Sequence, residues 1–423
     1  MPETDMDGRD MSYREELIER FFRYAAIASQ SDAASPRLPS SPGQADLAAL
    51  LARELHAIGL EDVTLDDHAI VTGLKRGTRP GAPRIGFIAH LDTVDIGLSP
   101  VVRPELVRFT GEDLCLNAKE DIRLRVAEHP EILPWTGKDI IVGDGTSVLG
   151  ADDKAAIAVI MTLLANLGPD DAHGDILVAF VPDEEIGLRG AAALDLTRFA
   201  CDFAYTIDCC GTGELMLENF NAASAEITFT GIAAHPMAAK DVLVNPLMMA
   251  TDFISGFDRT DTPEHTEGHD GFFWFRKLAG SDSEVTLTVL IRDFSEFGFE
   301  ERKGQLQSAT ERIRSLYPTG RVACEITDTY RNIAGFLLKD HRPASLLFAA
   351  FDRAGVIPKL MPMRGGTDGA VLSARGIPTP NFFTGAYNFH SRFEFLPVPA
   401  FEKSLEVAFA ICALAAEEDG GRG

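Results

Sequence analysis

Apolar residues recur along this chain with different periods, and those periods predict its secondary structure. Residues 13–28 and 44–58 carry apolar side chains at helical spacing, which predicts two amphipathic helices. Residues 63–74, 85–89 and 175–181 are short and mainly apolar, and each is expected to form a strand. Strands that alternate with helices in this way are typical of an α/β domain.

Two further stretches belong to this first part of the chain. Residues 155–167 are apolar and rich in alanine, so we expect a helix there. Residues 99–138 carry prolines and scattered charges without a clear period, and we expect a long irregular excursion over the surface.

The pattern changes after about residue 220. Residues 225–230 and 284–294 alternate between apolar and polar positions, while 244–257 and 299–316 have helical spacing. This combination predicts an α+β region with a half-buried antiparallel sheet. Beyond about residue 332 the buried style returns, with helices expected at 343–354 and 400–417. We therefore predict a main domain in two parts, 1–219 and 332–423, with residues 220–331 inserted between them.

Composition narrows the possible partners and compartment. The net charge of −25 argues against nucleic acid or an anionic membrane as a partner. The six cysteines show no CxxC spacing, which favours reduced thiols in the cytoplasm over disulfides. Residues 1–14 are polar and acidic, and no stretch approaches 18 apolar residues, so neither secretion nor membrane insertion is predicted. The acidic, glycine-rich residues 417–423 are expected to be disordered.

Acidic residues and histidines follow several of the apolar runs. The motifs are His90-Leu91-Asp92, Gly150-Ala151-Asp152-Asp153-Lys154, Pro182-Asp183-Glu184-Glu185, Tyr205-Thr206-Ile207-Asp208 and Tyr387-Asn388-Phe389-His390. Each motif is expected at the carboxyl end of a buried strand, which is where open α/β sheets bind ligands. Imidazoles and hard carboxylate oxygens in this order predict a two-metal hydrolytic site.

Each motif has a simpler alternative when it is taken alone. His90 and Asp92 face the same way on extended backbone, so Asp92 can orient a ligating imidazole, or both can be solvated turn residues. Asp152 and Asp153 can cap the following helix, with Lys154 as a surface charge, or one Asp can bridge two cations about 3.5–4 Å apart.

The two adjacent glutamates, Glu184 and Glu185, can take different roles. The side chains of Glu184 and Glu185 diverge, so that one can bind metal while the other faces the substrate; both can also be solvated loop acids. Asp208 is a further carboxylate at a strand end. Because the chain has only ten histidines, the occurrence of all five motifs together would be an unusual coincidence. Taken together, they favour the metal site over the simpler alternatives.

Longer stretches around these motifs resemble a known family. They are residues 149–155, 173–187, 218–224, 364–370 and 387–390. Over about residues 14–416 the chain resembles the peptidase T group, the tripeptide aminopeptidases among the dinuclear zinc exopeptidases, a family that also includes carboxypeptidase G and succinyl-diaminopimelate desuccinylase. The resemblance implies a zinc-dependent aminopeptidase that releases the N-terminal residue from tripeptides, with a small peptide as its partner.

The resemblance also assigns roles to the motif residues. It implies two Zn²⁺ ions with the ligands His90 and Asp208 on one, Glu185 and His390 on the other, and Asp152 as the bridge. Glu184 matches the general base, and Asp92 matches a catalytic aspartate beside the ligands. Asp153 is expected to be a non-ligating neighbour, joined to Asp152 by a cis peptide bond.

The implied fold is α/β. It has a catalytic domain with a mixed, mostly parallel sheet flanked by helices, and an inserted α+β lid domain that corresponds to residues 220–331. His235 matches a lid histidine that helps to hold the scissile carbonyl, and Arg292 matches an arginine that clamps the peptide carboxylate. Arg364 could line the same pocket. The alternatives are a turn histidine, a surface arginine and a loop arginine paired with Asp368.

Two departures from the family pattern bear on specificity. Cys209 and Cys210 follow Asp208 where the family has glycines, and they could crowd the pocket or make it sensitive to oxidation. Phe393 is less polar than the family pattern at that position. Two alternatives therefore stay open: a related amidohydrolase, either a carboxypeptidase or an N-acyl amino acid deacylase, and a non-catalytic metal- or peptide-binding relative. The preferred peptide, the metal used in the cell and the oligomeric state are also open.

Overall fold

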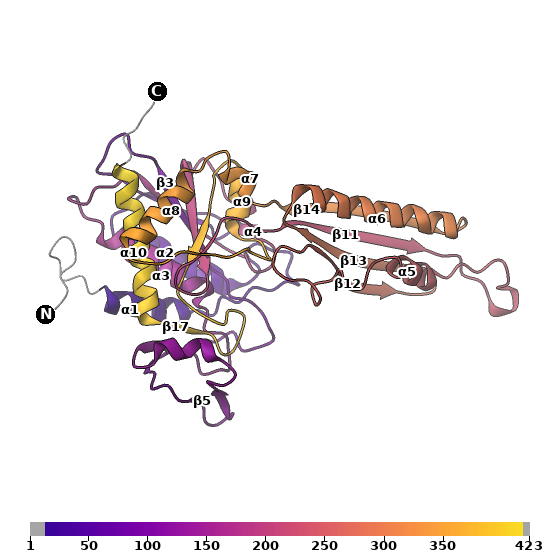
Figure 1. Ribbon diagram of the computed structural model, residues 1–423, viewed down its shortest axis with the longest axis horizontal. Helices are drawn as coiled ribbons and strands as arrows, with labels where there is room; N and C mark the ends of the chain where they lie inside the picture. Colours follow the sequence, from indigo (N-terminus) through magenta and orange to yellow (C-terminus); the bar gives the residue numbers. More distant parts are fainter. Residues whose placement is uncertain (1–12, 418–423) are drawn as a thin grey trace. The chain divides into compact units, whose positions relative to one another are not determined.

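The structure is a computed structural model that describes residues 13–417. The predictions for residues 417–423 and for most of residues 1–14 lie outside this range. The chain forms two compact units. The first contains the chain up to Leu217, Gly335–Met361 and the chain from Thr367 onward, and the second contains Glu218–Ala334 and Pro362–Gly366. Figure 1 shows both units with many of their helices and strands labelled.

An eight-stranded mixed sheet forms the centre of the first unit. Its strands are β1 (Glu61–Leu65), β2 (Val71–Lys75), β3 (Ile85–His90), β8 (Ile176–Val181), β9 (Phe203–Cys209), β10 (Glu214–Met216), β15 (Lys359–Leu360) and β16 (Asn381–Phe383). They lie in the order β1-β2-β8-β3-β9-β16-β10-β15. The neighbours β8, β3, β9 and β16 are parallel, whereas β1 and β2 are antiparallel. This confirms the predicted mixed, mostly parallel sheet.

The prediction of a single strand over residues 63–74 is wrong, because this stretch contains two strands. β1 and β2 form an antiparallel pair around a turn at Asp66. The carboxylate of Asp66 accepts hydrogen bonds from the backbone N–H groups of His68 and Ile70, each at 2.9 Å. Such a local side-chain bond stabilises a turn and interrupts the strand.

Helices cover both faces of this sheet. They are α1 (Arg14–Ala25), α2 (Pro42–Ala57), α3 (Ala151–Asn166), α4 (Arg189–Ala193), α8 (Arg342–Arg353), α9 (Asp368–Ala374) and α10 (Val398–Glu417), with the short α7 (Ala334–Leu337) after the second unit. Phe87 and Ala89 of β3 pack into the larger core with α1, α3 and α10, while Ile88 faces the smaller core with Leu372 of α9. α3 is buried from Ala151 to Leu164, which explains why its sequence is apolar on all sides.

The prediction of an irregular excursion at residues 99–138 is wrong, because this segment contains regular secondary structure. It contains β4 (Glu105–Arg108), β5 (Leu114–Asn117), β6 (Ile122–Leu124) and the 3₁₀ helix η1 (Pro130–Trp135), and it leads into β7 (Asp139–Val142). β7 pairs with β4 and with β17 (Phe395–Pro397). The segment buries a small core of its own around Phe109, Ile132 and Phe395. Its strands are too short to show a clear period in sequence.

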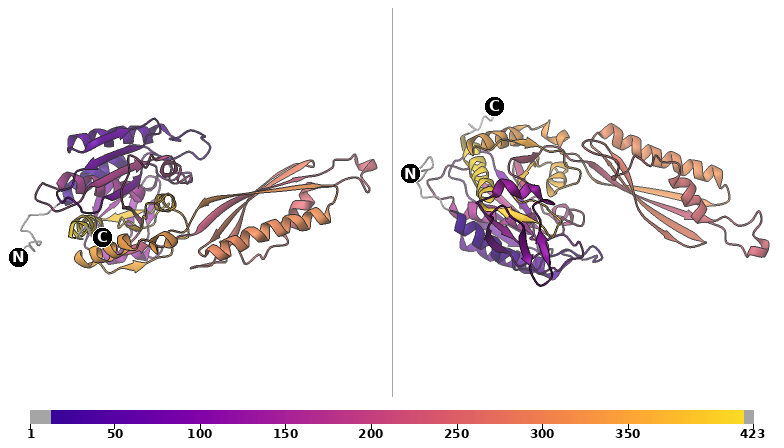
Figure 2. Two further views of the ribbon diagram at one scale, coloured as in Figure 1. Left: turned by 90° about the horizontal axis from the view of Figure 1, so that it is seen from above. Right: turned by 60° about the horizontal axis from the view of Figure 1, so that its bottom comes forward.

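The second unit is a four-stranded antiparallel sheet with two helices. Its elements are β11 (Asn221–Thr230), η2 (Pro236–Ala238), α5 (Pro246–Ile254), β12 (Phe272–Gly280), β13 (Glu284–Asp293), α6 (Glu296–Leu316) and β14 (Arg321–Tyr330). Alternate residues of β11 and β13 pack with both helices into one core, and Figure 2 shows α6 along that sheet. The edge strands β12 and β14 were not predicted, because most of their residues are exposed.

Within residues 13–417, none of the helices combines the length and the apolar character that a membrane crossing requires.

Candidate metal centre

Strand ends of the central sheet position most of the candidate ligands. His90 is the last residue of β3, Asp208 lies near the end of β9, and Glu184 and Glu185 lie in the turn after β8. The three strands are parallel neighbours, so that their carboxyl ends meet at one edge of the sheet. Asp152 lies beside them in the first turn of α3.

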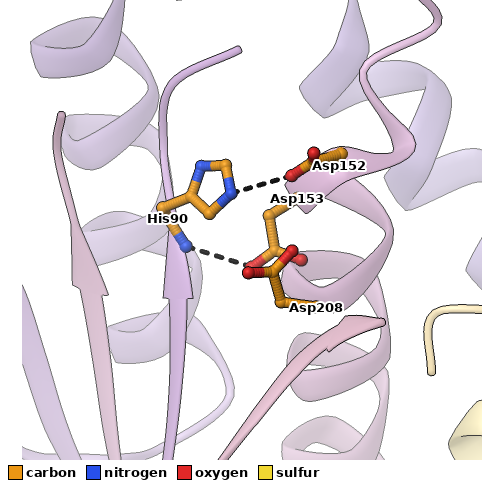
Figure 3. A group of neighbouring side chains, drawn as sticks. All are labelled: His90, Asp152, Asp153 and Asp208. Carbon is orange, nitrogen blue, oxygen red and sulfur yellow. Dashed lines mark hydrogen bonds and ion pairs between the residues drawn. The ribbon is translucent and has the colours of Figure 1, made fainter. Parts of the chain in front are cut away.

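Asp152 connects two histidines that are 300 residues apart in the chain. Its Oδ1 lies 2.9 Å from Nε2 of His90, and its Oδ2 lies 3.1 Å from Nε2 of His390. Figure 3 shows His90 and Asp152 facing each other, with Asp208 close by. A carboxylate whose two oxygens face two different imidazoles has the orientation that a bridging ligand needs.

Among the described residues, two sets of side chains bring ligand atoms within 4.8 Å of one another. One set is His90, Asp152, Asp153 and Asp208, and the other is Asp152, Glu185 and His390. In the second set, Oε1 of Glu185 lies 3.0 Å from Nε2 of His390. Imidazole nitrogens and carboxylate oxygens are donors that suit zinc, and the shared Asp152 suits a pair of ions. The structure thus brings all five predicted ligands together.

Asp153 is held by the backbone of β3. The Asp152–Asp153 peptide bond is cis, which confirms that prediction. Oδ2 of Asp153 accepts a hydrogen bond from the backbone N–H of His90 at 3.1 Å. This contact occupies one oxygen of Asp153 and fixes the start of α3 against the strand that carries His90.

Asp92 links the histidine motif to the glutamate pair. Its fully buried carboxylate accepts hydrogen bonds from the backbone N–H groups of Glu184 (3.0 Å) and Glu185 (3.2 Å). Nδ1 of His90 lies 3.0 Å from the carbonyl oxygen of Asp92 and 3.4 Å from its Oδ1. Asp92 therefore orients both the imidazole and the turn that follows β8.

Glu184 belongs to neither set of ligand atoms. Burial raises its pKa well above the usual value, and the negative charges of Asp208, Asp368 and Glu185 add to that effect against the opposing influence of His90. A buried carboxyl group whose pKa is raised in this way is typical of a general acid–base.

The carboxyl groups around Glu184 are crowded in the same way. Burial and the charge of Asp152 raise the pKa of Asp208 well above its usual value, and they also raise that of Glu185. Hydrogen bonds to Asp152 and Glu185 raise the pKa of His390 to about 11. Buried carboxylates that repel one another are stabilised by a cation, so that this electrostatic environment fits a divalent metal.

Sequence reasoning missed Glu394, which supports Asp152 from behind. Glu394 is 2% exposed, and its two oxygens accept hydrogen bonds from the backbone N–H groups of Gly150 (2.8 Å) and Asp152 (3.2 Å). Burial raises its pKa to about 8, and the charge of Asp152 contributes. A single acid between Phe393 and an apolar run was the only signal in the sequence.

Lys154 is not a surface charge, so that alternative is wrong. Its side chain is fully buried, and its Nζ donates a hydrogen bond to the carbonyl oxygen of Ile27 at 2.7 Å. Burial lowers its pKa to about 7, although Asp92 and Glu394 oppose the shift. The lysine ties the first turn of α3 to the end of the first helical segment.

Asp183 was also missed, and it anchors the turn before the glutamate pair. The residue is buried with φ of 59°. Its carboxylate accepts hydrogen bonds from the backbone N–H of Ser40 (2.9 Å) and from the side chain of Gln44 (2.7 Å). These bonds attach the loop before α2 to the turn that presents Glu184.

The two cysteines after Asp208 are thiols in a buried environment. Cys209 is part of the main core, and Cys210 is partly buried. Burial raises the pKa of both groups, and Asp208 and Glu214 contribute. Neither thiol belongs to the two sets of candidate ligand atoms.

The three predicted substrate residues all lie in the second unit. His235 is exposed, and its Nδ1 accepts a hydrogen bond from the backbone N–H of Met237 at 3.2 Å. Arg292 is partly buried, donates to the carbonyl oxygens of Ile291 (2.9 Å) and Ala223 (3.3 Å), and lies over the ring of Tyr330.

His235 and Arg292 lie near opposite ends of β11. Arg292 is paired with Ala222, near the start of this strand, whereas His235 follows its last residue, Thr230. At about 3.3 Å per residue, the strand alone separates these ends by roughly 26 Å. A tripeptide spans only about 10 Å. One copy of this unit therefore does not present both side chains to the same tripeptide.

Arg364 is engaged in holding a loop. Its guanidinium donates to the carbonyl oxygens of Gly268 and Asp270, both at 2.9 Å, and to Oγ1 of Thr266 at 2.8 Å. It also lies over the rings of Phe220 and Phe272. These contacts give Arg364 a structural role in the second unit, whatever else it binds.

Comparison with known proteins places the chain in a family. The family model described as "Peptidase family M20/M25/M40" matches residues 128–417. The chain belongs to this family of peptidases, which confirms the resemblance to the metal-dependent exopeptidases that the motifs indicated.

Relatives of the chain cover nearly its whole length. It is 69% identical to a peptidase T-like protein of Rhizobium meliloti, over 96% of this chain and 100% of the relative. It is 43% identical to a peptidase T of Desulfitobacterium hafniense, over 95% of this chain and 98% of the relative. The crystal structure of the aminopeptidase PepT from Bacillus cereus has the same fold, with a TM-score of 0.75 and 23% identity over 95% of this chain and 99% of that one.

Proposed function

We propose that this protein is a dinuclear zinc aminopeptidase that releases the N-terminal residue from tripeptides. The observation that carries the proposal is the orientation of Asp152, whose two oxygens face His90 and His390. Glu184 lies outside both sets of ligand atoms and supplies the extra carboxylate that hydrolysis requires. The 43% identity to a peptidase T supports the substrate class.

The ligand assignment follows the two sets of side chains. His90 and Asp208 would hold one Zn²⁺, Glu185 and His390 would hold the other, and Asp152 would be shared by both. When bound, such a pair polarises the scissile carbonyl and lowers the pKa of water. Asp92 and Glu394 keep the ligands in place through the backbone bonds described above.

Glu184 acts as the general base and then as the general acid. It accepts a proton from the attacking water and returns it to the nitrogen of the leaving amine. Asp92 fixes the backbone N–H of Glu184, so that the carboxyl group is presented in one direction. Burial raises the pKa of Glu184, which makes its carboxylate a stronger acceptor for the proton of the attacking water.

The lid residues are proposed to read the rest of the peptide. Arg292 binds the terminal carboxylate, because its guanidinium is bonded to main-chain carbonyl oxygens that an anion can replace. His235 holds the scissile carbonyl, whereas Arg364 supports the lid by holding its 266–270 loop. Because His235 and Arg292 lie near opposite ends of β11, we propose their two contacts as alternatives: within one lid, a given tripeptide is held either by His235 or by Arg292.

The cell compartment and partners follow from composition. The protein works in the cytoplasm on small peptides and binds neither nucleic acid nor anionic membranes, as its net charge of −25 and its unpaired cysteines suggest.

A substrate panel on the zinc-loaded protein tests the proposal. The panel contains one tripeptide in three forms, free, N-acetylated and C-terminally amidated, with products identified by mass spectrometry. Release of the N-terminal residue from the free peptide is expected. Release of the C-terminal residue would mean a carboxypeptidase, and removal of the acyl group would mean a deacylase. Metal binding without cleavage of any peptide would reject an enzymatic function.

A further inference from the structure

His390 is positioned differently from the other candidate ligands. His90, Asp208 and Glu185 are fixed by the ends of three paired strands. His390 instead lies in the loop of residues 388–394, which an antiparallel bridge between Tyr387 and Phe395 closes at its base. The central sheet therefore does not determine where its imidazole lies.

The backbone of this loop adopts an unfavourable conformation. Asn388 has φ of 59° and His390 has φ of 57°, in the left-handed region that L residues avoid. Asparagine tolerates this region better than histidine does. A contact from outside the loop would offset part of the cost of this conformation.

Glu131 supplies such a contact. Nδ2 of Asn388 donates a hydrogen bond to Oε1 of Glu131 at 2.6 Å, and the same amide lies 3.3 Å from the carbonyl oxygen of Phe393 at the far side of the loop. His129 adds to the contact, because its Nδ1 lies 3.2 Å from Oε1 of Glu131 and its ring packs on Phe393 at 4.7 Å between centroids.

The segment that carries Glu131 is itself anchored. Ile132, the next residue, is fully buried in the small core that also contains Phe395. β7 pairs with β17, so that Val142 lies opposite Phe395. The excursion and the strand β7 that follows it thus pack against the base of the His390 loop, and Glu131 is presented to the loop from a fixed position.

We propose that Glu131 and Asn388 are positioning residues that hold His390 in place, so that the excursion controls the occupancy of one of the two metal positions. The inference rests on the proposed function, because it assumes that His390 binds a cation. The Glu131–Asn388 bond joins the excursion to the ligand loop. Its loss should weaken the metal position that uses Glu185 and His390, and leave the position that uses His90 and Asp208.

Metal titration tests the inference without a substrate. The full chain is freed of metal with a chelator and titrated with Co²⁺ alone, followed by calorimetry and by visible absorption. The wild type is expected to bind two ions in two steps, and His390→Ala identifies the step that depends on His390. Glu131→Ala should weaken that step about tenfold or more and leave the other unchanged, since residues behind a ligand typically contribute 10–100-fold to affinity.

Two variants complete the design. Glu128→Ala is the matched control, because Glu128 is an exposed acid on the same segment that pairs only locally with Arg125. Glu131→Gln keeps an acceptor oxygen without the charge, and it should weaken the same step less than Glu131→Ala. It also keeps the test decisive if the alanine variant does not fold.

The outcomes separate the inference from the proposed function. A wild type that binds fewer than two ions would reject the dinuclear site itself. A wild type with two ions and a Glu131→Ala variant that behaves like Glu128→Ala would reject only the positioning role. Equal weakening of both steps in the two Glu131 variants would show a general effect on the fold, and would also overturn the inference.

Discussion

The metal centre and the second unit hold their candidate residues in opposite ways. At the centre the carboxylates are largely buried and have partners that fix them, as with Asp92 and the two backbone N–H groups of the glutamate pair. In the second unit His235 is exposed, and Arg364 is engaged with a loop. The first region is organised before a substrate arrives. The second would have to exchange existing contacts for new ones.

This difference shows for which residues a role can be assigned from the structure alone. Residues fixed by strand ends have one geometry, so that their chemistry follows from their distances. Residues on the exposed surface of a separate unit acquire a role only when a substrate binds. Variants at the centre should therefore cause large losses, and variants in the second unit should cause smaller and more selective ones.

The largest effect is expected from Glu184→Ala. Removal of a general base lowers kcat by about 10²–10⁴-fold, because proton transfer then falls to water. Metal content, measured by inductively coupled plasma mass spectrometry, should equal that of the wild type, since Glu184 is outside both ligand sets. A variant that kept more than about a hundredth of the wild-type kcat would show that another group moves the proton.

Glu394→Gln tests whether the support behind Asp152 matters as much as the ligands. Gln keeps one acceptor oxygen for the two backbone N–H groups of Gly150 and Asp152, and it brings an amide N–H₂ where the second acceptor was. We expect metal affinity to fall about 10–100-fold, as it does when groups behind a ligand are changed. Competition with a chromophoric chelator measures the loss. Wild-type affinity would mean that α3 alone fixes Asp152.

The sequence predicted the centre better than it predicted its supports. His90, Glu184, Glu185 and Asp208 stand out because each follows an apolar run and therefore comes at the edge of a sheet, whereas Asp152 lies in the first turn of α3. Their spatial grouping was correct, while the role of each as a ligand stays a prediction. The α/β fold with its mixed sheet was predicted for the same reason, since fully apolar strands indicate parallel neighbours.

The supports were missed because a buried charge and a surface charge look alike in sequence. Glu394 and Lys154 are both buried, and only their tertiary partners show it. The edge strands β12 and β14 were missed for a related reason: strands that are mostly exposed lack the apolar alternation that identified β11 and β13.

Arg292→Ala asks whether the second unit reads the peptide terminus. Loss of a charge-assisted bond to the terminal carboxylate costs roughly 1.5–3 kcal/mol, or about ten- to a hundredfold in kcat/KM for a free tripeptide. The same peptide amidated at its C-terminus should be affected much less. Metal content should not change, because Arg292 belongs to neither set of ligands. Equal losses of kcat/KM on both peptides would mean that Arg292 does not bind the terminal carboxylate and only stabilises the sheet of the second unit.

Arg364→Ala is expected to have the smallest effect on catalysis and a clear effect on stability. Its guanidinium bonds the 266–270 loop at three places and lies over two phenylalanine rings. Because the group is partly solvated, we expect a loss of about 1 kcal/mol, which lowers Tm of the second unit by roughly 5 °C. Arg364→Lys keeps the charge but not the several donors, and should restore only part of the loss. Scanning calorimetry gives Tm, and the ratio of kcat/KM for free and amidated tripeptides should stay at the wild-type value. A changed ratio with unchanged Tm would instead place Arg364 in contact with the substrate, and the two regions would then differ less than their present contacts suggest.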